Sequence, residues 1–466
     1  MSVLRRKVFN FYNHLPIPTK KVISCLGRFL PRSYLFGSTF QATLTHIRKT
    51  QYWNKKDLDN LGRYKLSRIL LHAYTTTPHY RREMQRENIS EGLIQQNPEG
   101  VLKRLPFIDK RIMLDRTDDF LSNSMHSTAY DHTSTGGTSG EPFYFYIDSN
   151  RSGKEWAFFV DQWSRVGFSL LSKRATFRGS RIHDRLWDDD WITRERKFSS
   201  FSLTDEYLSH IWPGLTDYDP DFLYAYPSTA VSLCQFIERT KNLLPETIKG
   251  ILLGSENIYD GQREYIERIS KKKVFLWYGH SEKLVLAGEC EYTNHYHAYP
   301  QYGYVEFINE SGEDAKHGEF AEIVGTGFIN TVMPFIRYRT GDYCTYLGDS
   351  CDKCGRNYHI FKDVRGRWTQ EVLYGKQGNP ICMSAINLHS NSFRNVFRFQ
   401  FFQDTPGEAI LRIIPKEGFS LQDQLALEKE FNQKFSGNLK VTAKIVGDIP
   451  LTSHAKYRFI DQKIVT

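Results

Sequence analysis

Residues 222–278 decide the fold, because three short apolar runs alternate there with two helical stretches. The runs are Phe222-Leu-Tyr-Ala-Tyr226, Ile251-Leu-Leu253 and Val274-Phe-Leu-Trp-Tyr278. Between them we expect one helix from Pro227 to about Lys241, with Ser228 as its N-cap, and another from Gln262 to Ser270. Strand–helix–strand–helix–strand at this spacing predicts parallel βαβ units with right-handed crossovers, and therefore an α/β fold.

Polar clusters follow the second and third strands of this region. Gly254-Ser-Glu-Asn257 comes after the second strand, and Tyr278-Gly-His-Ser-Glu282 comes after the third. In open parallel sheets, ligands bind beyond the carboxyl ends of the strands. Two acidic, glycine-bearing loops on one edge predict a ligand site there, although either loop alone is typical of a simple turn.

A third small-residue segment lies upstream, His132-Thr-Ser-Thr-Gly-Gly-Thr-Ser-Gly-Glu-Pro142. Its glycines permit backbone angles that let successive N–H groups face one concavity, and such a nest binds anions. The hydroxyl groups would add donors for phosphate oxygens. The Walker A pattern is absent, and Glu141 stands where a cation would be expected. Taken alone, the segment favours a surface turn over a phosphate cradle.

The remaining chain divides into a helical start, a β-rich middle and a compact tail. We expect a helix over 54–75, a strand over 143–147, an amphipathic helix around Trp156–Trp163, and strands between 303 and 346. Residues 180–205 resist assignment. The tail is expected to form strands over 396–403, 409–414 and 439–446, a helix over 421–435, and then a loop to the C-terminus. The interpretation is a large domain over 1–366 and a small, mobile α+β domain over 367–466.

Composition excludes several classes of protein. The chain has 466 residues and a formal net charge of +9, without a dense basic tract, so nucleic-acid binding is not expected. We find no signal peptide and no run long enough to span a membrane, so we expect a cytoplasmic protein. The basic, aromatic residues 1–40 allow a weak peripheral membrane contact as an alternative to an ordinary packed helical region. Seven cysteines then indicate reduced thiols or metal ligands.

Three cysteines and one histidine have the spacing of a zinc site. Cys290-x6-His297 is followed by Cys351-x2-Cys354, and two thiolates on one tight turn would supply half of a tetrahedral shell. The pattern predicts a structural Cys3His zinc site, in which His295 and Cys344 compete as ligands. The alternative is a set of ordinary reduced cysteines.

Five motifs in order resemble the adenylate-forming enzymes, and in particular the phenylacetate–CoA ligase family with its capsular-polysaccharide, CapK-like branch. These motifs are Ser134-Thr-Gly-Gly-Thr-Ser-Gly140, Tyr278-Gly-His-Ser-Glu282, Tyr338-Arg-Thr-Gly-Asp342, Gly366-Arg367 and Pro450-Leu-Thr-Ser-His-Ala-Lys456. The resemblance covers nearly the whole chain. It implies that ATP and Mg2+ activate a carboxylic acid as an acyl-adenylate, which CoA or another nucleophile then attacks.

The resemblance also implies a role for individual residues. The β- and γ-phosphates would be held by Thr135, Gly136, Gly137, Thr138, Ser139 and Gly140. Gly254, Ser255 and Glu256 would line the adenine, Tyr278 and Gly279 would lie against it, and Asp342 and Arg367 would bind the ribose. Ser281 would contact the α-phosphate, Glu282 would ligate Mg2+, and Lys456 would stabilise the charge that develops during attack.

Three departures from the family pattern concern the acceptor and the hinge. Glu141 replaces a lysine of the phosphate loop, Ala455 replaces a glycine before Lys456, and Trp368 follows Arg367 in place of the hinge aspartate. Two kinds of acceptor therefore stay open. One is CoA, and the other is an amine or hydroxyl compound used in surface-polysaccharide synthesis. The rival hypothesis is a catalytically silent scaffold that has kept the fold.

Overall fold

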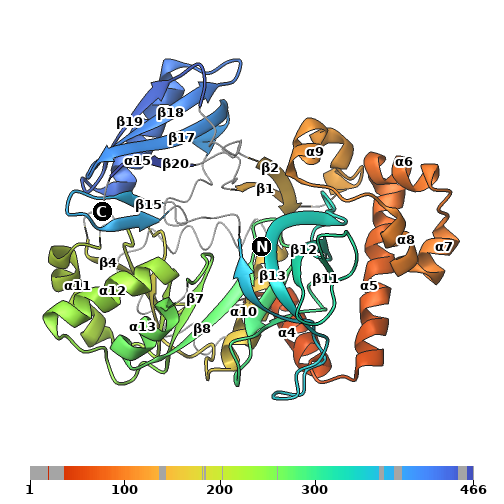
Figure 1. Ribbon diagram of the computed structural model, residues 1–466, viewed down its shortest axis with the longest axis horizontal. Helices are drawn as coiled ribbons and strands as arrows, with labels where there is room; N and C mark the ends of the chain where they lie inside the picture. The colour runs from red at the N-terminus through yellow and green to blue at the C-terminus, as the bar shows by residue number, and fades with distance from the viewer. Residues whose placement is uncertain are drawn as a thin grey trace. The chain divides into compact units, whose positions relative to one another are not determined.

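The chain divides into two compact units in a computed structural model (Figure 1). The structure describes residues 19, 36–127, 129–135, 143–180, 182, 185–201, 203–259, 261–366, 372–382, 391–449 and 459–464. Unit 1 comprises Met1–Thr133, Phe145–Leu170 and Phe275–Gly366. Unit 2 comprises Ser134–Tyr144, Leu171–Val274 and Arg367–Thr466. The separation into domains 1–366 and 367–466 stays a prediction. The mobility of the second domain also stays a prediction.

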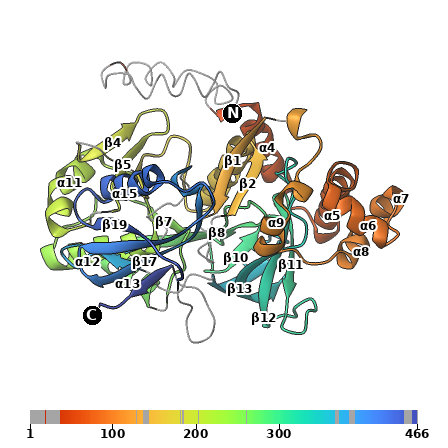
Figure 2. The same ribbon diagram turned by 90° about the horizontal axis from the view of Figure 1, so that it is seen from above.

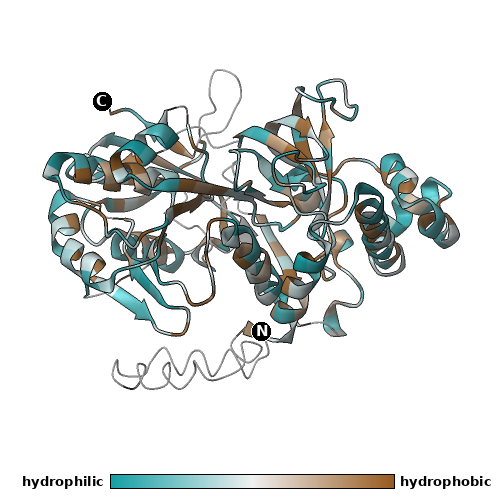
Figure 3. Cartoon of the chain, turned by 90° about the horizontal axis from the view of Figure 1, so that it is seen from below, coloured by the Kyte–Doolittle hydropathy of each residue, from teal (hydrophilic) through white to brown (hydrophobic). Residues whose placement is uncertain are grey.

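The first described part of unit 1, from residue 36 onward, is helical. Its longest helix, α5, begins after Asn54, whose side chain accepts a hydrogen bond from the backbone N–H of Asp57, and ends before Pro78 opens α6. Figure 3 shows teal turns with brown bands on these helices, as expected where one face packs on the rest of the unit. The helices are α4 (Ser38–Thr50), α5 (Lys55–Thr76), α6 (Pro78–Arg86), α7 (Glu91–Gln96), α8 (Pro98–Arg104), α9 (Lys110–Asp115) and α10 (Arg151–Ser164), with 3-10 turns η1 (Thr117–Phe120) and η2 (Met125–Ser127).

Unit 1 also contains most of a hairpin and a meandering antiparallel sheet. The hairpin joins β1 (Tyr130–Thr135) and β2 (Phe143–Asp148). The sheet has the strand order β11-β12-β13-β14-β10-β9-β8, and each described neighbouring pair is antiparallel. Its strands are β8 (Lys273–Gly279), β9 (Leu286–Glu289), β10 (Tyr296–Ala298), β11 (Gly303–Ile308), β12 (Phe320–Gly327), β13 (Tyr338–Gly348) and β14 (Ile360–Arg365).

The segment between β8 and β9 lies directly against β11 and β12. A Cβ atom on Gly303 would stand 1.9 Å from the carbonyl oxygen of Leu284, and a Cβ atom on Gly325 or Gly327 would stand 2.8 Å from the Leu284 side chain. Only glycine allows such a close backbone approach. This contact brings the residues that follow β8 next to β12 and its neighbour β13.

Unit 2 has a parallel sheet with the order β7-β6-β3-β5-β4, in which only β4 runs antiparallel to its neighbour. The predicted βαβ unit is confirmed, because β6 and β7 are parallel and α12 connects them. Residues 180–205 of this unit, to which the sequence analysis assigned no secondary structure, contain β4 and β5. Its elements are β3 (Arg174–Phe177), β4 (Trp187–Asp190), β5 (Glu195–Phe198), α11 (Asp205–Tyr218), β6 (Phe222–Ala225), α12 (Pro227–Thr240), β7 (Gly250–Gly254) and α13 (Gln262–Ser270).

The start of α12 differs from the sequence prediction. Tyr226 is the N-cap and Pro227 is the first helical residue, so the prediction of Ser228 as N-cap was wrong. The backbone N–H of Ser228 instead donates to Oε2 of Glu256 at 3.0 Å. A carboxylate from the loop after β7 therefore satisfies a free donor at the positive end of this helix.

The C-terminal residues of unit 2 form an α+β module in which α15 packs on a four-stranded sheet, as Figure 2 shows. Helix α15 begins with a capping box between Ser420 and Asp423. The predicted terminal loop is corrected in part, because Ile460–Gln462 form β20, parallel to β17. The elements are β15 (Val372–Tyr374), β16 (Pro380–Cys382), η3 (Asn391–Phe393), β17 (Val396–Thr405), β18 (Glu408–Pro415), α15 (Leu421–Phe435), β19 (Lys440–Ile445) and β20.

The hydrophobic core of this module includes residues from earlier in the chain. Phe201 and Tyr226 belong to the same buried cluster as Phe399, Phe431 and Phe435. The ring of Phe201 lies 6.0 Å from that of Phe435. Across the described ranges of both units, no helix is long and apolar enough to cross a membrane. The predicted peripheral membrane contact falls almost wholly on residues outside these ranges.

Replacing Gly303 with alanine tests the close approach of Leu284. The new Cβ would meet backbone rather than a flexible side chain, so we expect Gly303→Ala to lower the free energy of unfolding by about 2–3 kcal/mol in urea denaturation. Gly62→Ala is the matched control, since nothing lies within 4 Å of its Cβ position inside α5, and it should raise stability by about 0.5–1 kcal/mol. Equal effects of the two substitutions would contradict the packing described here.

Candidate active site and candidate metal centre

The residues after β8 and the start of β13 meet through a tyrosine and a carboxylate. The hydroxyl of Tyr278, at the end of β8, donates to Oδ2 of Asp342 on β13 at 2.9 Å. The ring of Tyr278 packs edge-on against Phe361 at 5.9 Å between centroids. Burial, followed by the nearby Asp342 carboxylate, raises the pKa of Tyr278 well above its usual value. The phenol therefore stays protonated and serves as a donor.

The turn that carries Asp342 is held by its own polar contacts. The backbone N–H of Asp342 donates to Oγ1 of Thr340 at 3.1 Å, and that hydroxyl donates to the carbonyl of Ile323 at 2.6 Å. Gly341 has a φ of 68°, which favours glycine, and its N–H donates to Glu322. The Thr-Gly-Asp sequence therefore fixes the direction of the Asp342 side chain.

Glu282 is buried beside a second tyrosine of the same sheet. The hydroxyl of Tyr338 donates to Oε1 of Glu282 at 3.2 Å, and Nδ1 of His280 lies 3.7 Å from Oε2. Glu282 is 9% exposed. A buried carboxylate is a suitable oxygen ligand for a hard cation such as Mg2+. Ser281 lies between these residues and is half-buried.

In unit 2, polar side chains gather at the carboxyl ends of β3, β6 and β7. These strands are in register at Phe177, Ala225 and Leu253. Arg178 follows β3, and its guanidinium lies over the rings of Tyr224 and Tyr226, at 4.4 and 4.7 Å from the centroids. It donates to the Tyr224 hydroxyl and, at 2.5 Å, to Oγ of Ser255.

The predicted adenine-lining residues Gly254, Ser255 and Glu256 lie at this edge of unit 2. Ser255 has a φ of 66°, an unfavourable conformation for a residue with a side chain. Such strain is concentrated at functional sites, because the surrounding structure must stabilise it. Glu256 is held by its contact with α12 described above.

Several predicted residues lie outside the described ranges. Thr135 ends β1, but the phosphate-loop residues Gly136, Gly137, Thr138, Ser139 and Gly140, the ribose-contacting Arg367 and the catalytic Lys456 are not described. Their roles stay predictions.

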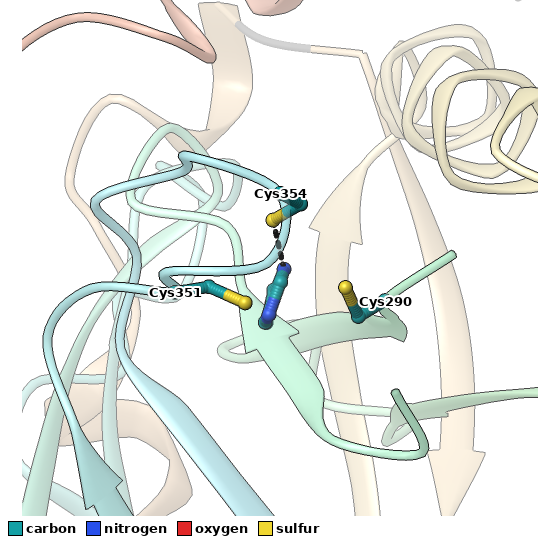
Figure 4. A group of neighbouring side chains, drawn as sticks. Cys290, Cys351 and Cys354 are labelled. Atoms are coloured by element: carbon teal, nitrogen blue, oxygen red, sulfur yellow. Dashed lines mark hydrogen bonds between the residues drawn. The ribbon is translucent and has the colours of Figure 1, made fainter. Parts of the chain in front are cut away.

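Cys290, His297, Cys351 and Cys354 form a compact group in unit 1. One ligand atom from each lies within 4.8 Å of all the others. Figure 4 shows the three sulfur atoms pointing toward one imidazole ring, and Sγ of Cys354 lies 3.8 Å from Nδ1 of His297. The rival ligands His295 and Cys344 are outside this group within the described part of the chain.

Local structure explains why these four side chains converge. Cys290 follows β9, and His297 lies on β10, which pairs with β9. Cys351 and Cys354 share a turn between β13 and β14, where the N–H of Gly355, at a φ of 75°, donates to the Cys351 carbonyl at 2.8 Å. Burial lowers the pKa of His297 to about 3, so its imidazole is neutral, as a metal ligand must be.

Sequence reasoning missed two residues of these sites. Tyr338 appeared only as the first letter of a motif, although the alternation of a strand would place 338, 340 and 342 on one face. Arg178 fell next to the segment that resisted assignment. Its position directly after a strand, at the edge where ligands bind, was an available signal.

Comparison with known proteins supports the predicted relationship. Residues 373–463 match the family described as the CapK C-terminal domain. Protein CapK of Staphylococcus aureus is 20% identical over 461 residues, covering 96% of this chain and 98% of CapK.

Solved structures show the same architecture. A crystal structure of 2-hydroxyisobutyryl-CoA ligase in the postadenylation state, in complex with R3-HIB-AMP, has a TM-score of 0.56 at 16% identity, covering 88% of this chain and 91% of the ligase. The same ligase with 2-HIB-AMP and CoA has a TM-score of 0.56 at 16% identity, covering 89% and 91%. The chain thus has the fold of the adenylate-forming ligases, and its residues 373–463 match the CapK C-terminal domain, which confirms the resemblance seen in its motifs.

Proposed function

We propose that this protein uses ATP to activate a carboxylic acid and then transfers the acyl group to a second nucleophile. In the first step a carboxylate oxygen attacks the α-phosphorus, and the bond to the β-phosphate breaks, releasing pyrophosphate. In the second step a thiol, amine or hydroxyl attacks the acyl carbon, loses its proton, and AMP leaves. Reactions of this kind depend mainly on positioning and charge stabilisation.

The observation that carries the proposal is the pair of oriented carboxylates in unit 1. Asp342 is held by Tyr278 and by its own turn, and it would accept hydrogen bonds from the ribose hydroxyls. Glu282 is buried and held by Tyr338, and it would ligate Mg2+. When bound, Mg2+ would neutralise negative charge on the phosphates.

The other predicted residues complete the proposed site. The loop 135–140 would hold the phosphates, Gly254, Ser255, Glu256 and Gly279 would surround the adenine with Tyr278, and Ser281 would contact the α-phosphate. Arg367 would bind the ribose. Lys456 would approach the attacking carboxylate and stabilise the charge on it and on the α-phosphate.

CoA is the first acceptor to test, since the structurally similar 2-hydroxyisobutyryl-CoA ligase was crystallised with it. The acidic Glu141 in the phosphate loop motivates the alternative, an amine or hydroxyl acceptor. Similarity to CapK favours a role in surface-polysaccharide synthesis.

Acid-dependent exchange of pyrophosphate into ATP tests the first step without knowledge of the acceptor. With a panel of aliphatic, aromatic and sugar acids, we expect at least one to support exchange. Because Lys456 would stabilise the transition state, Lys456→Ala should reduce the rate about 100- to 1,000-fold. Lys444→Ala is the control, since Lys444 is exposed on β19.

Two results would contradict this proposal. The first is a folded wild-type protein that fails to bind ATP with Mg2+ at millimolar concentrations. The second is equal exchange by Lys456→Ala and Lys444→Ala. Adding CoA to the reaction distinguishes the acceptors, because formation of an amide or ester without CoA excludes an obligatory thioester product.

We also propose that Cys290, His297, Cys351 and Cys354 bind a structural zinc ion. In a tetrahedral site with Zn–S bonds of about 2.3 Å, neighbouring sulfur atoms lie about 3.8 Å apart. The spread of 4.8 Å among the four ligand atoms needs only a small contraction to reach this geometry. Four protein ligands would leave no open position, so the ion would stabilise the fold and take no part in catalysis.

Metal analysis of purified protein tests the zinc site. We expect one zinc ion per chain, lost in the double substitution Cys351→Ser, Cys354→Ser, and a lower melting temperature after chelation, because metal binding energy is folding energy. Cys344→Ala is the matched control, since Cys344 is also buried but lies outside the group. Full zinc retention in the double variant, or its loss in Cys344→Ala, would refute this ligand set.

A further inference from the structure

Two tyrosine–carboxylate hydrogen bonds cross between the same two segments of unit 1. Tyr278 and Glu282 belong to the segment at the end of β8, and Tyr338 and Asp342 belong to the start of β13. Tyr278 donates to Asp342 at 2.9 Å, whereas Tyr338 donates to Glu282 at 3.2 Å. Each segment therefore contributes one tyrosine and one carboxylate, and each tyrosine contacts the carboxylate of the other segment. We call these four residues the crossed pairs.

Both donors are held in place by packing. Tyr338 is 1% exposed, and its ring lies edge-on to Phe335 at 5.3 Å between centroids. Tyr278 packs edge-on against Phe361, as described above. A hydroxyl on a fixed ring contributes a hydrogen bond at little entropic cost, and hydrogen bonds to charged acceptors are among the stronger ones in proteins.

Each bond orients one oxygen of a carboxylate. The tyrosine hydroxyl, which carries no charge of its own, donates to Oδ2 of Asp342 or to Oε1 of Glu282. Two other acids of the same sheet pair with an arginine. Glu306 pairs with Arg337 at 3.1 Å, and Glu322 pairs with Arg339 at 2.5 Å. An oriented carboxylate is suited to receive a ligand's hydroxyl groups or a cation.

We propose that Tyr278 and Tyr338 are positioning residues of the ATP site, with Tyr278 orienting Asp342 toward the ribose and Tyr338 orienting Glu282 toward a divalent cation. This inference rests on the proposed function. It assigns the two hydroxyl groups different tasks, so their removal should have different consequences.

Binding of ATP and of 2′,3′-dideoxyATP, which lacks both ribose hydroxyls, is measured by calorimetry over a range of Mg2+ concentrations and tests the assignment. Tyr278→Phe keeps the ring but removes the hydroxyl, and Asp342 then loses its orientation. We expect the Kd for ATP to rise about tenfold, the strength of one such hydrogen bond, while the Kd for 2′,3′-dideoxyATP changes less than threefold. The preference for the ribose hydroxyls is therefore largely lost.

Tyr338→Phe should produce the complementary result. We expect the Mg2+ concentration for half-maximal ATP affinity to rise about tenfold, while the ratio between the Kd values for ATP and 2′,3′-dideoxyATP at saturating Mg2+ stays unchanged. The two variants thus separate ribose recognition from metal dependence, which a general loss of stability would not do.

Tyr346→Phe is the matched control. Tyr346 lies on β13 and donates its hydroxyl to Asp349, so the substitution removes a tyrosine–carboxylate bond of the same kind outside the crossed pairs. We expect neither binding quantity to change.

Three outcomes would overturn the inference in distinguishable ways. If the wild-type protein does not bind ATP, the proposed function fails and the inference fails with it. If the wild type binds ATP but Tyr278→Phe weakens ATP and 2′,3′-dideoxyATP equally, Tyr278 does not position a ribose ligand. If Tyr338→Phe leaves the Mg2+ dependence unchanged, the role assigned to Tyr338 is wrong, whatever the result for Tyr278.

Discussion

The close approach of the Leu284 backbone to Gly303, with Gly325 and Gly327 alongside, is the constraint on which unit 1 depends. Strand β8 and the start of β13 are separated by three strands in the order of the sheet. They still meet, because the segment after β8 lies across β11 and β12, where glycines leave room for its backbone. Without that contact, the hydroxyl of Tyr338 could not reach Glu282.

Charge is arranged differently in the candidate site and in the surrounding sheet. Arg337 is buried and pairs with Glu306, and this pair tethers the sheet because the same guanidinium donates to the carbonyls of Lys103 and Leu105. Burial nevertheless raises the pKa of Glu306, so the cost of burying its carboxylate is only partly offset. At Glu282 and Asp342, by contrast, an uncharged tyrosine hydroxyl orients the carboxylate.

Local pattern predicted much of the fold. The apolar runs at 222–226, 251–253 and 274–278 correspond to β6, β7 and β8, and helix α15 has the predicted bounds. The charged strands β4 and β5 escaped prediction, since Trp187–Asp190 shows no apolar alternation and forms a strand only through its pairing with β5. Strand β20 also escaped prediction. It has only three residues paired with β17, too few to show an apolar alternation in the sequence.

Tertiary contacts explain the parts of the candidate site that the sequence did not reveal. The Thr-Gly-Asp turn and the Cys-x2-Cys turn are local, and their motifs could be read directly. The crossed pairs depend on strands that come together only after the sheet has formed, so neither tyrosine could be assigned its partner from spacing. Ser228 is a different case. Pro227 is the first helical residue, so Ser228 lies inside the helix, and its backbone N–H donates to Glu256, which is distant in sequence.

A crystal structure of this protein with AMP and Mg2+ would show whether Asp342 binds the ribose. We expect ribose hydroxyl groups about 2.7–3.0 Å from a carboxylate oxygen of Asp342, while the Tyr278 hydroxyl still contacts that carboxylate. Electron density for AMP at another surface, with Asp342 contacting only protein atoms, would contradict it.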